Sequence, residues 1–233
     1  MVKNHMKRIT APKTWSVQRK TSKFITKPKP GAHKLEQSVA INTFFKELAH
    51  VTNTTKESKY VLTFDEVLVN GRRRRDFKTP VGFLDVITIK STKKNFLITV
   101  DNKGALKPKE LDEKLASQRL LKITNKHIIG KDKVQINTMN GENLLVSDKE
   151  AKKYKLGDSL IVEVGSLKVL EHVSFKEGGL VFVYVGKHAG KSGELKAVSD
   201  KSVTIKNNDD EFETSKDYLL AVNKEKIVEF ELK

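Results

Sequence analysis

The 233-residue sequence predicts a mixed α+β protein that is mostly β and is divided into small domains. Short segments rich in β-branched residues recur along the chain between polar turns, which is typical of small barrels or curled sheets. Hydrophobic residues make up 37% and charged residues 32%, enough for several small cores but not for one large core. We expect a basic extended arm at residues 1–37, a domain of two helices and strands at 38–92, a central β-rich domain at 93–172 and a small barrel at 173–233.

The composition restricts the class of partner. The chain has 45 basic and 29 acidic residues, a net charge of +16, which predicts a polyanionic partner such as nucleic acid. It has no cysteine, which excludes disulfides, thiolate zinc sites and cysteine nucleophiles. No apolar run approaches the roughly 20 residues of a membrane span, and the basic N-terminus lacks the apolar core of a signal peptide. The six histidines show no metal or triad spacing, so we expect no catalytic residue, no metal, no cofactor and no small-molecule substrate.

The basic arm carries most of the excess charge. Residues 1–35 contain ten lysine and arginine residues and no acidic residue, and the KPKPG stretch breaks any helix. A disordered tail is one interpretation, but Trp15, Phe24 and Ile25 are interleaved with the cations, and disordered tails are poor in aromatic residues. We expect an extended arm that orders on RNA, is protease-sensitive without it, and places Trp15 either on a base or on the body of the protein.

Two helices are expected next. Residues 38–50 carry an apolar stripe at helical spacing, with Ser38 as a possible N-cap. Thr54 and Glu57 have the spacing of a capping box and predict the start of a second helix that ends near Phe64.

The stretch VLVNGRRRRDF predicts a hairpin with an unusual charge run. Asn70-Gly71 between extended segments is a strong type I′ turn signal, so residues 67–69 form one strand and the return strand begins near Arg72. Four consecutive arginines repel one another, and only Asp76 balances them. A solvated loop is the alternative, but we favour an anion-binding hairpin. The GFLD turn then leads into a strand at 86–90.

The remaining chain predicts short strands. Residues 108–121, opened by Pro108, are predicted as a short helix. Strands are expected at 95–100, 120–124, 127–130, 133–139 and 142–147. Within 153–164, a Gly-Asp-type turn is expected to lead into another strand, and further strands follow after residue 179. Near the end, Gly186, Gly190 and Gly193 punctuate a basic loop. Such a loop can bring backbone N–H groups close to phosphate. It can also be a bulged β-turn in an SH3-like barrel, and the two interpretations are compatible.

Several stretches resemble known RNA-binding elements. The two helices with VLVNGRRRRDFKTPVGFLDVI resemble an S4-type RNA-binding domain, although GFLD replaces the adjacent Gly-Asp of that signature. GLVFVYVGKHAGKSGELKAV resembles the KOW motif, which implies an SH3-like barrel. Together with HMKRITAPKTW and PGAHKL, these stretches resemble the S4e family of archaeal and eukaryotic small-subunit ribosomal proteins. The end of the chain at EKIVEFELK, without a long basic extension, is more similar to archaeal members.

The resemblance implies a structural role in the small ribosomal subunit, in the cytoplasm, without catalysis. The partners it implies are small-subunit rRNA and other small-subunit ribosomal proteins, with no membrane involved. S4-type domains also occur on RNA-modifying enzymes, so a modification or ribosome-assembly factor is one alternative. A transcription or chromatin factor that uses a KOW-type barrel is another.

The charge runs and the resemblance together give the predicted RNA-binding residues. They fall on the arm, on the second helix, on the arginine hairpin and on the glycine loop. They are Lys3, Lys7, Arg8, Lys13, Trp15, Arg19, Lys20, Lys56, Lys59, Arg72, Arg73, Arg74, Arg75, Lys78, Lys187, His188, Gly190 and Lys191. For Lys56 and Lys59, solvation of a helix face is an equally simple explanation.

Overall fold

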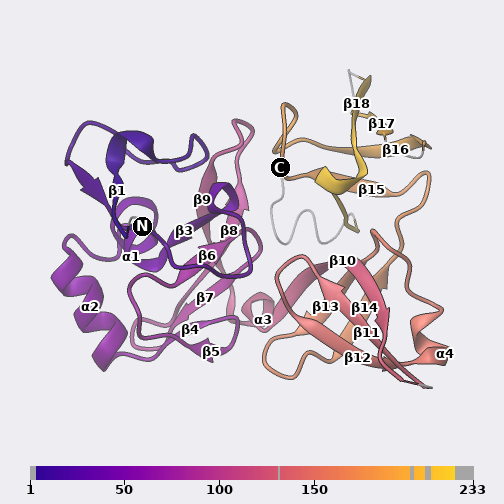
Figure 1. The fold of residues 1–233 in the computed structure, drawn as a ribbon, viewed down its shortest axis with the longest axis horizontal. Helices are drawn as coiled ribbons and strands as arrows, with labels where there is room; N and C mark the ends of the chain where they lie inside the picture. The colour runs from indigo at the N-terminus through magenta and orange to yellow at the C-terminus, as the bar shows by residue number, and fades with distance from the viewer. Residues whose placement is uncertain (1–3, 131, 200–201, 208–210, 224–233) are drawn as a thin grey trace. The chain divides into compact units, whose positions relative to one another are not determined.

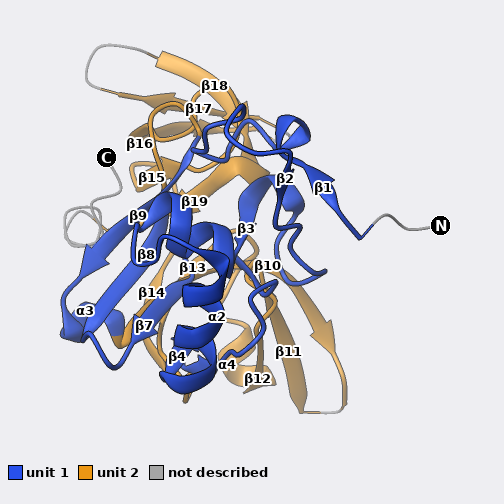
Figure 2. Cartoon of the chain, turned by 90° about the vertical axis from the view of Figure 1, so that its left-hand side faces the viewer, with its two compact units in different colours: residues 1–99, 105–116 blue, residues 100–104, 117–233 orange. Residues whose placement is uncertain are grey.

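The computed structural model describes residues 4–130, 132–199, 202–207 and 211–223. The chain forms two compact units, one of residues 1–99 and 105–116 and the other of residues 100–104 and 117–233 (Figure 2). Strands outnumber helices in both units (Figure 1), so the prediction of a mostly β protein with few helices is confirmed.

Unit 1 is built on one larger sheet and two small ones. The larger sheet has five strands in the order β5-β4-β7-β8-β9. The two small sheets pair β1 with β2 and β3 with β6. The strands are β1 (Met6–Lys7), β2 (Phe24–Ile25), β3 (Ser38–Ala40), β4 (Val67–Val69), β5 (Arg72–Arg73), β6 (Pro80–Gly82), β7 (Val86–Ile89), β8 (Lys94–Val100) and β9 (Leu106–Leu111).

The first predicted helix of unit 1 is shorter than expected. Residues 38–40 form β3, which pairs with β6, and the helix consists of α1 (Ile41–Thr43) and a π-helical turn (Phe44–Leu48). Pairing with a strand about 40 residues away overrides the local helical spacing. The hydroxyl of Ser38 donates to the Lys34 carbonyl (3.0 Å), so Ser38 is not the N-cap.

The second helix agrees with its prediction. Helix α2 (Thr55–Phe64) begins after Thr54, whose side chain accepts from the Glu57 backbone N–H at 3.2 Å. The Glu57 carboxylate in turn accepts from the Thr54 backbone N–H at 3.3 Å, which completes the capping box. Leu62 of α2 is fully buried and packs toward the core of unit 1.

The core of unit 1 is formed mainly by residues between positions 39 and 98. It includes side chains from β3, from the two helices and from the central strands of the sheet. Those with no exposed surface include Val39, Ile41, Phe44, Phe45, Leu62, Val67, Val81, Ile87 and Ile98.

The N-terminal arm is docked on unit 1. Trp15 is only 2% exposed, its indole N–H donates to the Leu35 carbonyl (3.3 Å), and its backbone pairs with Leu106. The guanidinium of Arg8 is buried and donates to both carboxylate oxygens of Glu47, at 3.0 and 2.6 Å. Of the two positions predicted for Trp15, packing on the protein is the one found. The docked arm differs from the expected arm that orders only on RNA, because these contacts bury one aromatic ring and one ion pair.

Unit 2 contains two five-stranded sheets with antiparallel pairing between consecutive neighbours. The first has the order β12-β11-β10-β13-β14 and the second β18-β17-β16-β15-β19. The strands are β10 (Gln118–Ile128), β11 (Lys133–Thr138), β12 (Asn143–Ser147), β13 (Ser159–Glu163), β14 (Val169–Val173), β15 (Leu180–Val183), β16 (Ser192–Val198), β17 (Ser202–Lys206), β18 (Glu211–Ser215) and β19 (Leu219–Ala221). One short helix, α4 (Asp148–Ala151), follows β12.

The helix predicted at residues 108–121 is wrong. Residues 106–111 form β9, and only α3 (Glu113–Ala116) is helical. Pro108 is tolerated in a strand because β9 lies at the edge of its sheet, where a missing N–H leaves no ladder bond unmade. The two strands predicted at 120–124 and 127–130 are largely one strand, β10, with a bulge after Ile123 where it changes partner from β13 to β11.

Each sheet of unit 2 has its own apolar core. One contains Leu121, Ile123, Ile136, Leu144, Leu160 and Val162. The other contains Val181, Val183, Leu195, Val203, Ile205, Phe212 and Leu219. Lys122 links them, because its ammonium donates to the carbonyls of Lys216 (3.1 Å) and Asp217 (2.8 Å). Burial lowers the pKa of Lys122 to about 8. This ammonium is therefore part of the internal hydrogen bonding of unit 2 and is not a surface cation.

The docked arm leads to a spectroscopic prediction. Trp15 is the one tryptophan of the sequence, so its emission reports on the arm alone. We expect a blue-shifted emission maximum in the free protein and little change when RNA is added. We also expect trypsin to cut slowly between residues 4 and 35 without RNA. Emission typical of a water-exposed indole, or rapid removal of the arm, would contradict the docked position.

Candidate RNA interface

The arginine hairpin has the predicted geometry. Asn70 (φ 55°) and Gly71 (φ 77°) both adopt left-handed backbone conformations between β4 and β5, as a type I′ turn requires. Arg72, Arg73, Arg74 and Arg75 all have exposed side chains. The hairpin therefore presents four cations to solvent on a short, tightly turned element.

A buried carboxylate holds the tip of this hairpin in place. Asp85, only 3% exposed, accepts from the Asn70 side-chain amide (2.9 Å) and from the Gly82 backbone N–H (2.8 Å). The imidazole Nε2 of His33 lies 2.9 Å from the same carboxylate. The Asn70 side-chain oxygen accepts from the backbone N–H of Val86 (2.9 Å). The NG turn, the GFLD turn and the PGAH stretch thus meet at one carboxylate.

Position 82 requires glycine because the side chain of His33 and the backbone of Gln37 lie directly against it. A Cβ atom at Gly82 would lie 2.5 Å from Cγ of His33 and 2.7 Å from the carbonyl oxygen of Gln37. No side chain fits there without displacing the imidazole from Asp85. The sequence signal was the GFLD turn itself, for which a turn role of Asp85 was expected. The contact with His33 was not foreseen.

Helix α2 adds cations beside the hairpin. Lys56 and Lys59 are exposed, and the ammonium of Lys59 lies 4.6 Å from the ring centroid of Phe77. The guanidinium of Arg73 reaches the carbonyl of Thr63 in the last turn of α2, at 3.5 Å. The side chain of Lys78 also lies near the Phe77 ring, at 5.8 Å. The helix and hairpin therefore form one basic face of unit 1, which is called here the hairpin face.

Two aromatic residues of α2 were missed by the sequence reasoning. Tyr60 is 62% exposed and Phe64 is 69% exposed, and their ring centroids are 4.5 Å apart. Their i, i+4 spacing on a helix whose apolar positions otherwise turn inward was the available signal. Exposed rings next to cations are the residue types that stack on unpaired bases.

The predicted arm residues divide into three groups. Lys7, Lys13 and Lys20 are exposed and remain available to a ligand. Arg8 and Trp15 are buried: Arg8 pairs with Glu47, and Trp15 packs on the body. The remaining two residues form the third group. The Arg19 guanidinium donates to the carbonyls of Ile9, Ala11 and Pro12 and so stabilises the conformation of the arm. Lys3 lies outside the described residues.

The glycine loop of unit 2 mixes exposed and structural residues. Lys187 is exposed. His188 stacks on Phe212 with centroids 4.3 Å apart, and the ammonium of Lys191 lies 5.5 Å from the same ring. Gly190 is buried at φ 84°, and a Cβ there would lie 2.6 Å from the backbone of Asn102. This close approach to the backbone gives Gly190 a structural role in the loop.

The sequence and the fold can now be compared with known proteins. The model of ribosomal family S4e matches residues 92–169, and the model of the RS4NT (NUC023) domain matches residues 2–36. The small ribosomal subunit protein eS4 of Archaeoglobus fulgidus is 35% identical over 230 residues, covering 96% of this chain and 95% of that protein. The chain belongs to the ribosomal protein S4e family.

Further S4e relatives agree. The eS4 proteins of Methanococcus maripaludis and Methanocaldococcus jannaschii are each 31% identical over at least 95% of both chains. The crystal structure of the 30S ribosomal protein S4e from Thermoplasma acidophilum is similar, with a TM-score of 0.67 and 26% identity, covering 80% of this chain and 95% of that one. S4e is a family of structural ribosomal proteins and not of enzymes, which confirms the predicted family and excludes the modifying-enzyme alternative.

Two further properties follow from the residues that the structure describes. Among them, no group of three or more histidine, aspartate or glutamate side chains is arranged to hold a metal ion. Within the same ranges, no helix is both long and apolar enough to cross a membrane.

The Asp85 cluster leads to a stability prediction. Asp85→Ala leaves the Gly82 N–H, the Asn70 amide and the His33 ring without their shared acceptor in a buried site. We expect the free energy of unfolding to fall by about 2–4 kcal/mol, measured by urea denaturation.

A matched control comes from the same unit. Glu66 forms a surface ion pair with Lys90 at 2.9 Å. Glu66→Ala should cost less than about 1 kcal/mol, because exposed ion pairs contribute little. Equal losses in the two variants would show that Asp85 is not a fixed point of the fold.

Proposed function

We propose that the chain is a structural component of the small ribosomal subunit that binds and stabilises small-subunit rRNA, alongside other small-subunit ribosomal proteins. The observation that carries the proposal is the hairpin face: four exposed arginines on a turn held by a buried carboxylate, in a member of the S4e family. A flexible basic tail would also bind RNA, but it would not fix the position of one strand against another.

The proposed mechanism is recognition of phosphate and shape. A-form RNA hides the base edges of its major groove, so a basic protein contacts phosphates, 2′-hydroxyl groups and irregular junctions. Arginine suits this role because its planar guanidinium binds a phosphate with two parallel hydrogen bonds. Tyr60 and Phe64 would add stacking on bases that leave the helical stack at a junction.

The finer domain arrangement is part of the same proposal. We assign residues 38–92 as an S4-type domain, supported by the helix pair, the NG hairpin and the GFLD turn. We assign residues 173–233 as a KOW-type, SH3-like domain, supported by the order β18-β17-β16-β15-β19 and by the glycine loop. Residues 1–37 are the arm, and 93–172 are the central domain. The exposed Lys187 of the glycine loop would give a second phosphate contact.

Replacing the arginines tests the hairpin face. Arg72→Gln, Arg73→Gln, Arg74→Gln and Arg75→Gln combined should weaken binding to Archaeoglobus fulgidus small-subunit rRNA by more than about tenfold at moderate salt. The slope of log affinity against log salt should become shallower by about 2–4, because each lost phosphate contact removes about 0.7–0.9. Filter binding at several salt concentrations measures both quantities, and circular dichroism checks the fold.

The control removes the same charge from unit 2. Lys149, Lys152, Lys153 and Lys155 are exposed near α4, and replacing all four by Gln should change the salt slope much less. Equal effects of the two quadruple variants would mean that net charge, and not the hairpin face, determines binding. Stronger binding of the wild-type protein to duplex DNA than to rRNA would instead favour a transcription or chromatin role.

A further inference from the structure

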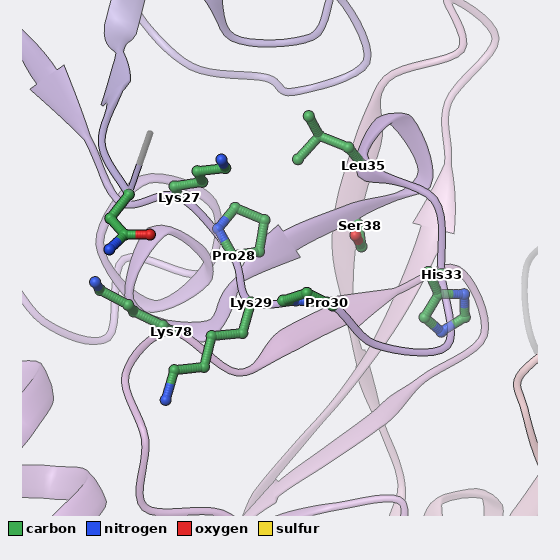
Figure 3. Close-up of a pocket in the computed structure, with 9 residues that line it drawn as sticks. Lys27, Pro28, Lys29, Pro30, His33, Leu35, Ser38 and Lys78 are labelled. Atoms are coloured by element: carbon green, nitrogen blue, oxygen red, sulfur yellow. The ribbon is translucent and has the colours of Figure 1, made fainter. Parts of the chain in front are cut away.

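A pocket of about 420 Å³ lies in unit 1 between the end of the arm and the chain that follows the arginine hairpin. Figure 3 shows three lysines around one side of it, and two prolines between them and the far wall. The lining residues are Asn4, Lys27, Pro28, Lys29, Pro30, His33, Leu35, Ser38 and Lys78. A backbone bond from the Lys29 N–H to the Lys78 carbonyl (2.9 Å) joins the two walls.

Three lysines line one side of the pocket. They are Lys27, Lys29 and Lys78, and the Asp76 carboxylate contacts the last two. Asp76 is paired with the Lys29 ammonium and accepts from the Lys78 backbone N–H at 2.9 Å. The hydrogen bond from Lys29 is the main cause of a lowered pKa of Asp76, so this carboxylate stays ionised. Lysine side chains are a residue type that binds phosphate in proteins.

The rest of the lining combines the polar residues Asn4, His33 and Ser38 with apolar side chains. Pro28 is buried, and Pro30 lies on the same stretch of chain. Leu35 is 43% exposed at the far wall, where its backbone carbonyl accepts from the Trp15 indole. His33 has a side chain only 4% exposed and is held by Asp85. Proline rings and a leucine offer flat apolar surface to an aromatic ring, and they lose little conformational entropy when they do so.

The size of the pocket selects the kind of ligand. A volume of about 420 Å³ is in the range of sites that enclose one small molecule, roughly 300–1,000 Å³. An intact RNA helix cannot enter it. A single nucleotide has the matching parts: an anionic phosphate for the lysines and a flat base for the prolines and Leu35.

We propose that this pocket binds one unstacked nucleotide of RNA, with its phosphate on the side of Lys27, Lys29 and Lys78 and its base against Pro28, Pro30 and Leu35. The inference rests on the proposed rRNA-binding function and adds a specific site to it. The pocket lies directly after the hairpin in the chain, since Arg75 and Asp76 are consecutive. An acidic peptide of a neighbouring protein is the competing ligand.

The test compares single-stranded and duplex RNA of equal length, using the full chain and fluorescence anisotropy. Leu35→Tyr fills the pocket without changing the charge, and Leu145→Tyr is the matched control because Leu145 is 67% exposed in unit 2. Lys29→Gln removes one pocket cation, and Lys90→Gln is its control, since both lysines are exposed and paired with a carboxylate. In parallel, amide NMR shifts of residues 27–35 are recorded with a nucleoside monophosphate, inorganic phosphate and hexa-aspartate.

The expected result separates the pocket from the hairpin face. Leu35→Tyr and Lys29→Gln should each weaken single-strand binding by about three- to tenfold and leave duplex binding unchanged, while the two controls change neither. The nucleoside monophosphate should shift residues 27–35 more than phosphate or hexa-aspartate does. Unchanged single-strand binding in Leu35→Tyr, or equal or larger shifts with phosphate or the acidic peptide, would overturn the nucleotide site. If the wild-type protein bound neither RNA, the proposed function itself would fail.

Discussion

The buried carboxylate of Asp85 is the interaction on which the candidate interface depends. It joins His33, Asn70 and the Gly82 backbone within 2.8–2.9 Å, although His33 and Asn70 lie 52 and 15 residues from it in the sequence. A buried carboxylate is tolerated only when its oxygens are fully hydrogen-bonded, so the three segments have to meet. That requirement fixes the arginine hairpin through Asn70. It also fixes His33, which lines the pocket that contains Lys27, Lys29 and Lys78. Unit 2 repeats the arrangement: Asp158 accepts from the backbone N–H groups of Lys155 and Phe175 (both 2.8 Å) and lies 2.7 Å from the ring of His172.

The positive charge of the chain is divided between the interior and the surface. Arg8 is buried and pairs with a carboxylate, and Lys122 is buried and donates to carbonyl oxygens. Arg19 donates to carbonyl oxygens of the arm and stabilises its conformation. The arginines of the hairpin face remain exposed. Net charge alone therefore predicts the class of partner but not the contact surface. The exposed arginines lie on a hairpin held by hydrogen bonds. The protein therefore loses little conformational entropy when it binds an RNA strand.

Local chemistry was predictable from the sequence, and distant pairing was not. The capping box at Thr54 and the type I′ turn at Asn70 depend on neighbouring residues, and the structure confirms both. The helix start at Ser38 and the helix after Pro108 were wrong, because β3 and β9 are fixed by strands and loops elsewhere in the chain. For the same reason, the burial of Trp15 against residues 35 and 106 carried no local signal. Among the candidate residues, exposed charge was foreseen on the hairpin, while the aromatic pair on α2 and the pocket were missed because each needs three-dimensional proximity.

The measurement that tests the central claim most directly is sedimentation of a cell extract in which the full chain replaces its counterpart in an archaeal S4e-containing organism. Each gradient fraction is probed for the protein after a moderate salt wash. The account predicts that the protein remains with the small subunit at one copy for each subunit, and that the hairpin-face arginine variant is lost from it at lower salt. Recovery of the wild-type protein only in free fractions, or only on precursor RNA, would contradict a structural role in the mature subunit.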